Sequence, residues 1–317
     1  MNAVFQPREI DDTSTPMDPQ HIGQLAAAGT AFLWTLSTLA WTSAGRKVGA
    51  LVVSFLRLAI TCVFLAVYGL LARGMWLPTD ATPQAWWVLG LSGFSGFFLS
   101  DLCLFKAFLL IGPRLSLLVQ SFTPPITAIL SWLWLDEPLP GQQWLAMTVT
   151  VAGVAWVVLE RRADGAQAQP AETRRRGLWL ALLAAVAGAV GTVLSRQVMR
   201  DSDYDPFAAT FIRVLGAMVG YLAVITLVRR WKAIAVGAAH AQAMAIVVFG
   251  SLVGPFLGVA LCMVALRYSH AGVTATIVST MPVLILPFAV LVYREKVSLR
   301  AAGGAALAVA GVALLAF

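Results

Sequence analysis

Length, composition and charge indicate an integral membrane protein and exclude most other classes. The 317 residues are 59% hydrophobic and only 12% charged, with a mean hydropathy of +0.82, whereas a soluble domain is about half apolar and a quarter charged. The formal charge of +7 is scattered between apolar blocks, which fits contact with membrane lipid and not with nucleic acid. Cys62, Cys103 and Cys262 fall inside such blocks without a CxxC pair, so we expect no disulfide, metal or cofactor.

The apolar residues come in blocks of about twenty, the length that a helix needs to cross a membrane. The blocks do not alternate apolar and polar residues as barrel strands do, so we expect an all-α fold. Residues 1–21 are polar and acidic and are predicted to be a disordered N-terminal tail. Ten transmembrane helices are then predicted in chain order, at residues 24–44, 50–71, 86–109, 114–135, 143–159, 178–198, 206–228, 242–266, 271–292 and 299–317.

A charged segment, residues 160–177, is predicted to be a linker between two similar halves, 22–159 and 178–317. A shift of 158 residues aligns several landmarks of the halves: Gly96 with Gly254, Ser121 with Ser279, Pro124 with Pro282, Glu137 with Glu295, and the run Val151–Ala155 with Val309–Ala313. A shift of 156 aligns the arginines of the second helices, Arg57 and Arg213. Because each half has an odd number of helices, the second enters the membrane from the opposite side. The sequence therefore predicts two inverted five-helix repeats with a pocket between them that either side can open, the arrangement of alternating access.

The same landmarks resemble one transporter family. They are the second-helix arginines, the run from Gly96 through Asp101 and Lys106 to Arg114, the fourth helix ending at Glu137, and the closing Ala-Gly-Val-Ala helix. Over residues 24 to 317 this pattern resembles the EamA family of the drug/metabolite transporter superfamily. The resemblance implies a ten-helix metabolite exporter, with relatives that export amino acids or carry nucleotide sugars or phosphorylated sugars. The first helix lacks the glutamate of the small multidrug exporters, which argues against their cation/proton antiport.

The expected location is the cell's inner membrane. Two arguments disagree on which side of this membrane the termini lie. Five basic residues lie on the side shared with the N-terminus and fourteen on the other, so the positive-inside rule places both termini outside. The family resemblance implies that both termini are cytoplasmic. We retain the family orientation, because a ten-helix arrangement is inherited whole.

Four charged side chains fall well inside predicted helices, where a charge is costly and is a functional candidate by default: Arg57, Asp101, Lys106 and Arg213. We hypothesise that Asp101 holds Lys106 or Arg57, or takes up a proton in a coupled cycle. The remaining positive charge would meet an anionic group of the solute, such as a carboxylate. The alternatives are a structural ion pair at Asp101 and arginines that reach a headgroup region.

Further binding candidates are polar or aromatic residues of the helices expected to line the pocket: Trp34, Gln120, Ser121, Ser195, Thr276 and Ser279. Hydroxyl groups in membrane helices can instead bond their own backbone. Gly250, Gly254 and Gly258 form overlapping GxxxG spacings that favour close helix packing. Pro124 and Pro282 are predicted to kink matched helices, as gates or as static bends. Glu137 and Glu295 end matched helices, and we expect a nearby arginine or the amides of the next helix to hold such an acid in a structural role.

We therefore expect a secondary transporter of a small solute. No nucleotide-binding loop is present, and His21, His240 and His270 are too far apart in sequence to suggest an enzyme. A channel or a scaffold without carrier activity is the alternative. The sequence does not choose the substrate, the coupling ion or the oligomeric state.

Overall fold

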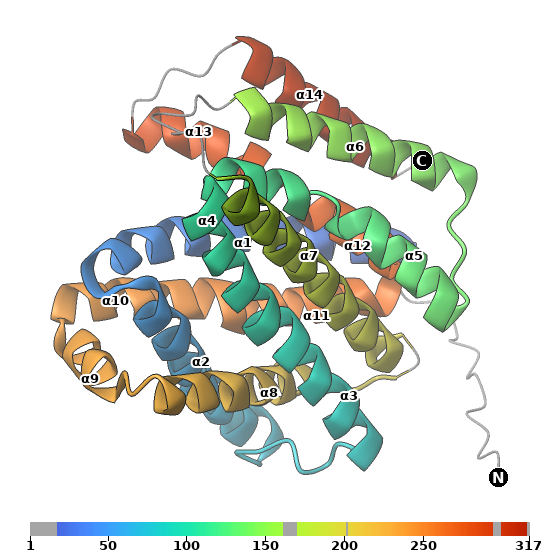
Figure 1. Ribbon diagram of the computed structural model, residues 1–317. Helices are drawn as coiled ribbons and strands as arrows, with labels where there is room; N and C mark the ends of the chain where they lie inside the picture. Colours follow the sequence, from blue (N-terminus) through green and yellow to red (C-terminus); the bar gives the residue numbers. More distant parts are fainter. Residues whose placement is uncertain (1–17, 161–169, 201, 294–298, 316–317) are drawn as a thin grey trace.

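The computed structural model describes residues 18–160, 170–200, 202–293 and 299–315, and Figure 1 shows their helices. The first half contains α1 (Pro19–Val48), α2 (Ala50–Arg73), α3 (Pro83–Gly93), the π-helix η1 (Phe94–Leu99), α4 (Ser100–Gln120), α5 (Thr123–Leu135) and α6 (Gly141–Glu160). The second half contains α7 (Ala171–Met199), α8 (Pro206–Leu227), α9 (Trp231–Ala239), α10 (Ala241–Ser251), the π-helix η2 (Leu252–Gly258), α11 (Val259–Tyr268), α12 (Ala271–Val278), α13 (Met281–Tyr293) and α14 (Leu299–Leu314).

The membrane-spanning pattern agrees with the predicted all-α fold. Within the described ranges, nine helical stretches of 18 to 30 residues are long and apolar enough to cross a membrane. α14 supplies the tenth position with 16 described residues and lies along α6 at one edge of the bundle (Figure 1). The short helix α9 was not predicted; it lies on the connection between α8 and α10.

The contact between α6 and α14 shows that the two halves are inverted. A Cβ atom on Gly153 would lie 2.4 Å from the backbone nitrogen of Ala308, and one on Gly311 would lie 2.4 Å from Oγ1 of Thr150. The residue numbers rise along α6 as they fall along α14, so the helices are antiparallel. Since each glycine is the repeat equivalent of the other, equivalent helices of the two halves run in opposite directions.

The third span of each half contains a π-helix at the matched position. η1 begins at Phe94 and η2 at Leu252, which are 158 residues apart. A π-helix inserts an extra residue per turn into an α-helix and is frequent at functional sites. Each π-helix packs against the first two spans of the other half: η1 contacts α7 and α8, and η2 contacts α1 and α2. The matched irregularities therefore lie at the interface between the halves.

The fourth span of each half is broken, as the prolines predicted. α4 and α5 are separated by a turn at Ser121 and Phe122, and α12 and α13 by a turn at Ser279 and Thr280. Proline at the start of the next helix lacks the amide that would continue the hydrogen-bond ladder. The third and fourth spans of the first half are separated inside α4 by Gly112, whose φ of +77° favours glycine.

Two predicted boundaries differ from the structure. Helix α7 begins at Ala171, inside the predicted linker 160–177, and Glu172 in its first turn favours a helix start there. Helix α1 also begins before residue 21, the predicted end of the N-terminal tail. The side chain of Asp18 accepts from the amide of Gln20 and starts α1 at Pro19. Residues 1–17 and 161–169 lie outside the described residues.

We call the membrane face at which α1 begins the first face. The turns that follow α2, α5, α7 and α11 lie on this face, because successive spans alternate in direction. The turns after α1 and α8 lie on the opposite, second face. In Figure 1 the first face is on the right, where α5 and α7 end.

Candidate functional site

Arg213 lies in α8, inside the bundle, and is only 5% exposed. Its Nε donates to Oγ of Ser92 at 3.0 Å, and its Nη1 lies 3.8 Å from the sulfur of Met263. Its guanidinium carbon lies 4.4 Å from the centre of the Phe97 ring, within cation–π range. Arg213 therefore does not reach toward a headgroup region, which was one of the two alternatives for it.

Ser195 is joined to Arg213 through Ser92. The two serine oxygens are 2.7 Å apart, and each hydroxyl lies within hydrogen-bond distance of the carbonyl oxygen of Gly191, at 2.6 Å for Ser92 and 2.9 Å for Ser195. α3 and α7 come close together here because Gly191 has no side chain. A Cβ atom on Gly191 would lie 2.9 Å from the carbonyl oxygen of Ser92.

Arg57 occupies the equivalent position in α2, but its guanidinium forms an ion pair with Asp101. The same guanidinium carbon lies 4.5 Å from the centre of the Trp41 ring. The side chains of Arg57 and Asp101 are 12% and 26% exposed. Of the two partners expected for Asp101, the structure selects Arg57.

The prediction that Lys106 lies in the interior is wrong, because its side chain is exposed. It lies about two turns before the helix break at Gly112, close enough to the second face for a long lysine stem to reach it. The four charged residues predicted inside the helices also omit a buried carboxylate. Glu137 is 7% exposed.

The glycine stripe of the eighth span holds the aromatic side chains of α1. A Cβ atom on Gly250 would lie 2.5 Å from Nε1 of Trp41, and one on Gly258 would lie 2.6 Å from Cδ1 of Trp34. A Cβ atom on Gly254 would lie 2.8 Å from the side chain of Ser37. The glycines of the GxxxG spacings therefore have the packing role expected for them. Gly250 in particular makes room for the Trp41 ring that Arg57 contacts.

Three hydroxyl candidates bond to their own helices, the alternative given for them above. Ser121 donates to the carbonyl of Leu118 at 2.7 Å, and Ser279 donates to that of Thr276 at 2.7 Å. Thr276 donates to the carbonyl of Gly272 at 2.7 Å. Gln120 differs, because its Oε1 is buried and accepts no hydrogen bond from the described residues.

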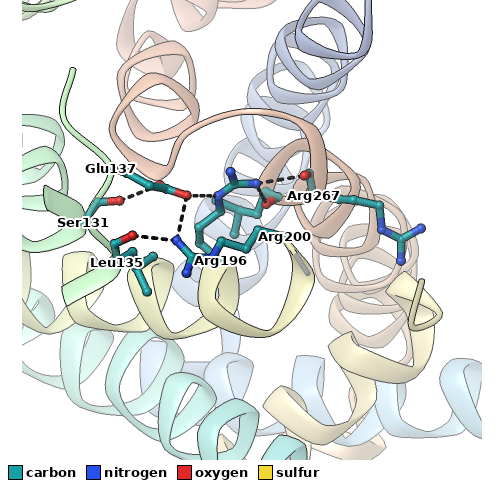
Figure 2. Close-up of polar contacts among 7 residues, drawn as sticks. Ser131, Leu135, Glu137, Arg196, Arg200 and Arg267 are labelled. Atoms are coloured by element: carbon teal, nitrogen blue, oxygen red, sulfur yellow. Dashed lines mark hydrogen bonds and ion pairs between the residues drawn. The ribbon is translucent and has the colours of Figure 1, made fainter. Parts of the chain in front are cut away.

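At the first face, Glu137 is the centre of a polar network shown in Figure 2. Its Oε1 accepts from Nε of Arg196 at 2.9 Å and lies 3.5 Å from Nη1 of Arg200. Its Oε2 accepts from the hydroxyl of Ser131 at 2.8 Å. The expected arginine partner of Glu137 is thus present, whereas Glu295 lies outside the described residues.

Both arginines also hold the ends of neighbouring helices. Nη1 of Arg196 donates to the carbonyl oxygens of Leu266 at 2.6 Å and Arg267 at 2.8 Å. Nη1 of Arg200 donates to the carbonyl of Leu135 at 2.7 Å. We call these residues, with Glu137 and Ser131, the Glu137 network. It ties the end of α5, in the first half, to α7 and α11 in the second (Figure 2).

Two titratable groups beside the network have shifted pKa values. Burial lowers the pKa of His270; the Glu137 carboxylate opposes this shift and the Arg196 guanidinium adds to it. Burial, together with the Asp80 carboxylate, raises the pKa of Tyr204 to about 12. The hydroxyl of Tyr68 donates to Oδ2 of Asp205 at 2.9 Å and adds another contact between the halves at this face.

Several of these residues were not found from the sequence. Ser92, Phe97 and Met263 carry no repeat match or motif that distinguishes them from other residues of apolar helices. The predicted topology limits the possible partners of Glu137 to the arginines at the same membrane face. It does not say which helix ends meet there, so Arg196 and Arg200 could not be identified.

Comparisons with known proteins agree with this architecture. Residues 21–159 and 175–317 match the EamA-like transporter family, one match in each half. A protein of known crystal structure is similar to the chain with a TM-score of 0.72 at 21% identity, over 92% of this chain and 96% of that chain, and this likeness shows the fold. No curated protein matches the chain. Because the family matches cover most of both repeats, the chain belongs to the EamA-like transporter family.

Proposed function

We propose that the protein is a secondary transporter that exports a small metabolite, such as an amino acid or another carboxylate-bearing solute, by alternating access. The observation that carries this proposal is the mutual packing of the irregular spans: η1 lies on α7 and α8, and η2 lies on α1 and α2. In inverted-repeat carriers, irregular spans at the repeat interface form the solute site, and exchange of the halves' conformations opens either side.

The Glu137 network supports a closed first face. It joins the two halves through Arg196, and its hydrogen bonds must break before those helix ends can separate. At the second face the halves are joined by the bond from Nζ of Lys47 to Oε1 of Gln242, at 2.7 Å, and by the packing of the Phe55 ring against the Trp231 ring, whose centres are 5.8 Å apart. A cycle of opening and closing at the first face therefore requires the Glu137 network to form and break.

Asp101 is the candidate for proton coupling. Its carboxylate is paired with Arg57, so protonation would weaken the pair and release the arginine.

We propose that both termini are cytoplasmic in the inner membrane, which makes the first face cytoplasmic. Labelling of single cysteines in the turns after α5 and α8 with an impermeant maleimide, in intact and in opened cells, tests this orientation.

Counterflow in proteoliposomes tests the transport function. Liposomes loaded with an unlabelled amino acid, nucleoside or sugar phosphate should accumulate the same labelled solute transiently, and uptake should saturate. Protein-free liposomes are the control. Flux that does not saturate and shows no counterflow would indicate a channel, and the absence of flux for every solute class would support a scaffold.

A further inference from the structure

We infer that Arg213 is the residue that binds the carboxylate of the transported solute. The solute's carboxylate would pair with Arg213 as the carboxylate of Asp101 pairs with Arg57. This inference rests on the proposed transport function for its physiological meaning. It assigns the two second-helix arginines to different tasks, although they occupy equivalent positions in the repeats.

The assignment follows from a broken symmetry. Arg57 and Arg213 are equivalent, and the shift of 158 residues that aligns the third spans sets Asp101 against Val259. The first half thus contains a carboxylate for its arginine, and the second half contains valine where that carboxylate would be. Among the residues that the structure describes, no carboxylate forms an ion pair with Arg213.

The guanidinium of Arg213 has N–H donors left over to bind an anion. The guanidinium has five N–H donors arranged to bind a carboxylate through two parallel hydrogen bonds. In the described part of the chain, its hydrogen bonds go to one hydroxyl oxygen, on Ser92, and to the weakly accepting sulfur of Met263. Arg213 is nevertheless 95% buried, since its exposed fraction is 5%. A buried charge without a counterion is costly, and an anionic solute would remove that cost.

The site lies directly beneath the Glu137 network. Ser195, which contacts the Ser92 partner of Arg213, is next to Arg196 in α7. Met263 lies one turn before Leu266, whose carbonyl oxygen accepts from Arg196. Breaking the network would therefore free the two helices that cover Arg213, and would give a solute from the first face a path to the guanidinium.

The geometry also offers a way to supply the missing carboxylate from the protein. Val259 lies one helical turn before Met263 in α11, so both side chains are on the side of the helix that faces Arg213. The substitution Val259→Asp would rebuild the first-half pair in the second half. Val259→Asn introduces a side chain of the same shape without the charge and is the matched control.

Binding is measured first, with purified protein and without transport. The melting temperature is followed during titration with acetate, propionate and pyruvate, each against acetamide or propionamide at constant ionic strength, with a separate phosphate series. Wild type should be stabilised by the carboxylates and not by the amides. Arg213→Gln should lose this response, and Arg213→Lys should retain a weaker one. Val259→Asp should melt at a higher temperature than Val259→Asn and should not respond to carboxylates.

The inference is overturned if no carboxylate stabilises wild type, if Arg213→Gln responds as wild type does, or if phosphate is preferred to every carboxylate. Counterflow separates this result from the transport function. If carboxylates stabilise the protein only when Arg213 is present, but counterflow is not observed, the binding site is supported and the transport function is rejected. Undiminished counterflow of a carboxylate solute by Arg213→Gln or Val259→Asp would keep the carrier and reject the site.

Discussion

The carboxylate of Glu137 and the guanidinium of Arg196 join the two halves of the protein at the first face, with 2.9 Å between Oε1 and Nε. Both side chains are nearly buried, at 8% and 11% exposure. Nη1 of Arg196 donates to the carbonyl oxygens at the end of α11, so the same pair connects α5, α7 and α11. A contact of this kind can close one side of a carrier because Arg196 links three helix ends, and each of its bonds must break before the ends separate.

Glu137→Gln should destabilise the protein by about 3 kcal/mol, because removing one partner leaves a buried guanidinium without its counterion. Thermal unfolding of the purified protein measures the effect. The control is Asp80→Asn, which removes an ion pair with Arg73 at the same face. Asp80 is 38% exposed, so the control should lose no more than about 1 kcal/mol. Equal losses in the two variants would contradict a special role for Glu137.

Acid should weaken the first face through His270. Burial places the pKa of this histidine below its usual value of about 6.5. The unfolded chain therefore binds more protons than the folded protein as the pH falls through about 6.5, and the free energy of unfolding should decrease there and be constant above. Melting temperatures from pH 8 to pH 5 test this, and His270→Gln should flatten that part of the profile. A wild-type profile with the opposite slope would refute the argument.

Gly250→Ala should disturb the Arg57 site through Trp41, the side chain nearest to a Cβ atom added at residue 250. The added Cβ would lie 2.5 Å from Nε1 of Trp41 and displace the ring on which Arg57 packs. Overpacking of this kind costs about 1 to 3 kcal/mol. The control is Gly303→Ala in α14, where a Cβ meets nothing within 4 Å and a helix gains up to about 1 kcal/mol.

A second substitution separates the clash from a general loss of glycine. The smaller ring of Trp41→Phe should reduce the cost of Gly250→Ala, so the double variant should be more stable than the sum of the single losses predicts. Thermal unfolding of all four proteins completes this cycle. Additive losses would show that the Trp41 contact does not cause the effect.

Much of the fold could be predicted from the sequence because crossing a membrane imposes strong local rules. Apolar blocks of fixed length determine the spans, and the matched prolines predict the breaks before Pro124 and Pro282. The π-helices could not be predicted, because these spans have no clear apolar stripe in which the shift caused by an extra residue would be visible. α9 was missed for a related reason, since its nine residues are too few for a span.

The site was predicted less completely, because charge alone does not say which way a side chain points. Arg57, Asp101 and Arg213 were correctly placed inside the bundle, whereas Lys106, on the same helix as Asp101, is exposed. Asp101 and Lys106 are five residues apart, which places them about 140° from each other around a helix. Only the packing of neighbouring helices decides which of the two faces inward.

The inverted arrangement predicts which cysteines can be cross-linked between α6 and α14. A Cβ atom on Gly304 would lie 3.1 Å from Cγ2 of Val157, so Val157→Cys with Gly304→Cys should form a disulfide on mild oxidation, in a background with the three native cysteines replaced by serine. Ala146→Cys with Gly304→Cys is the control. These positions are 158 residues apart and would be neighbours if the repeats were parallel, but in the antiparallel pair they are about 16 Å apart along the helix axis. A mobility shift on a non-reducing gel detects the bond. Cross-linking of 146 with 304 in place of 157 with 304 would reject the inversion, and with it the exchange of conformations between the halves on which alternating access depends.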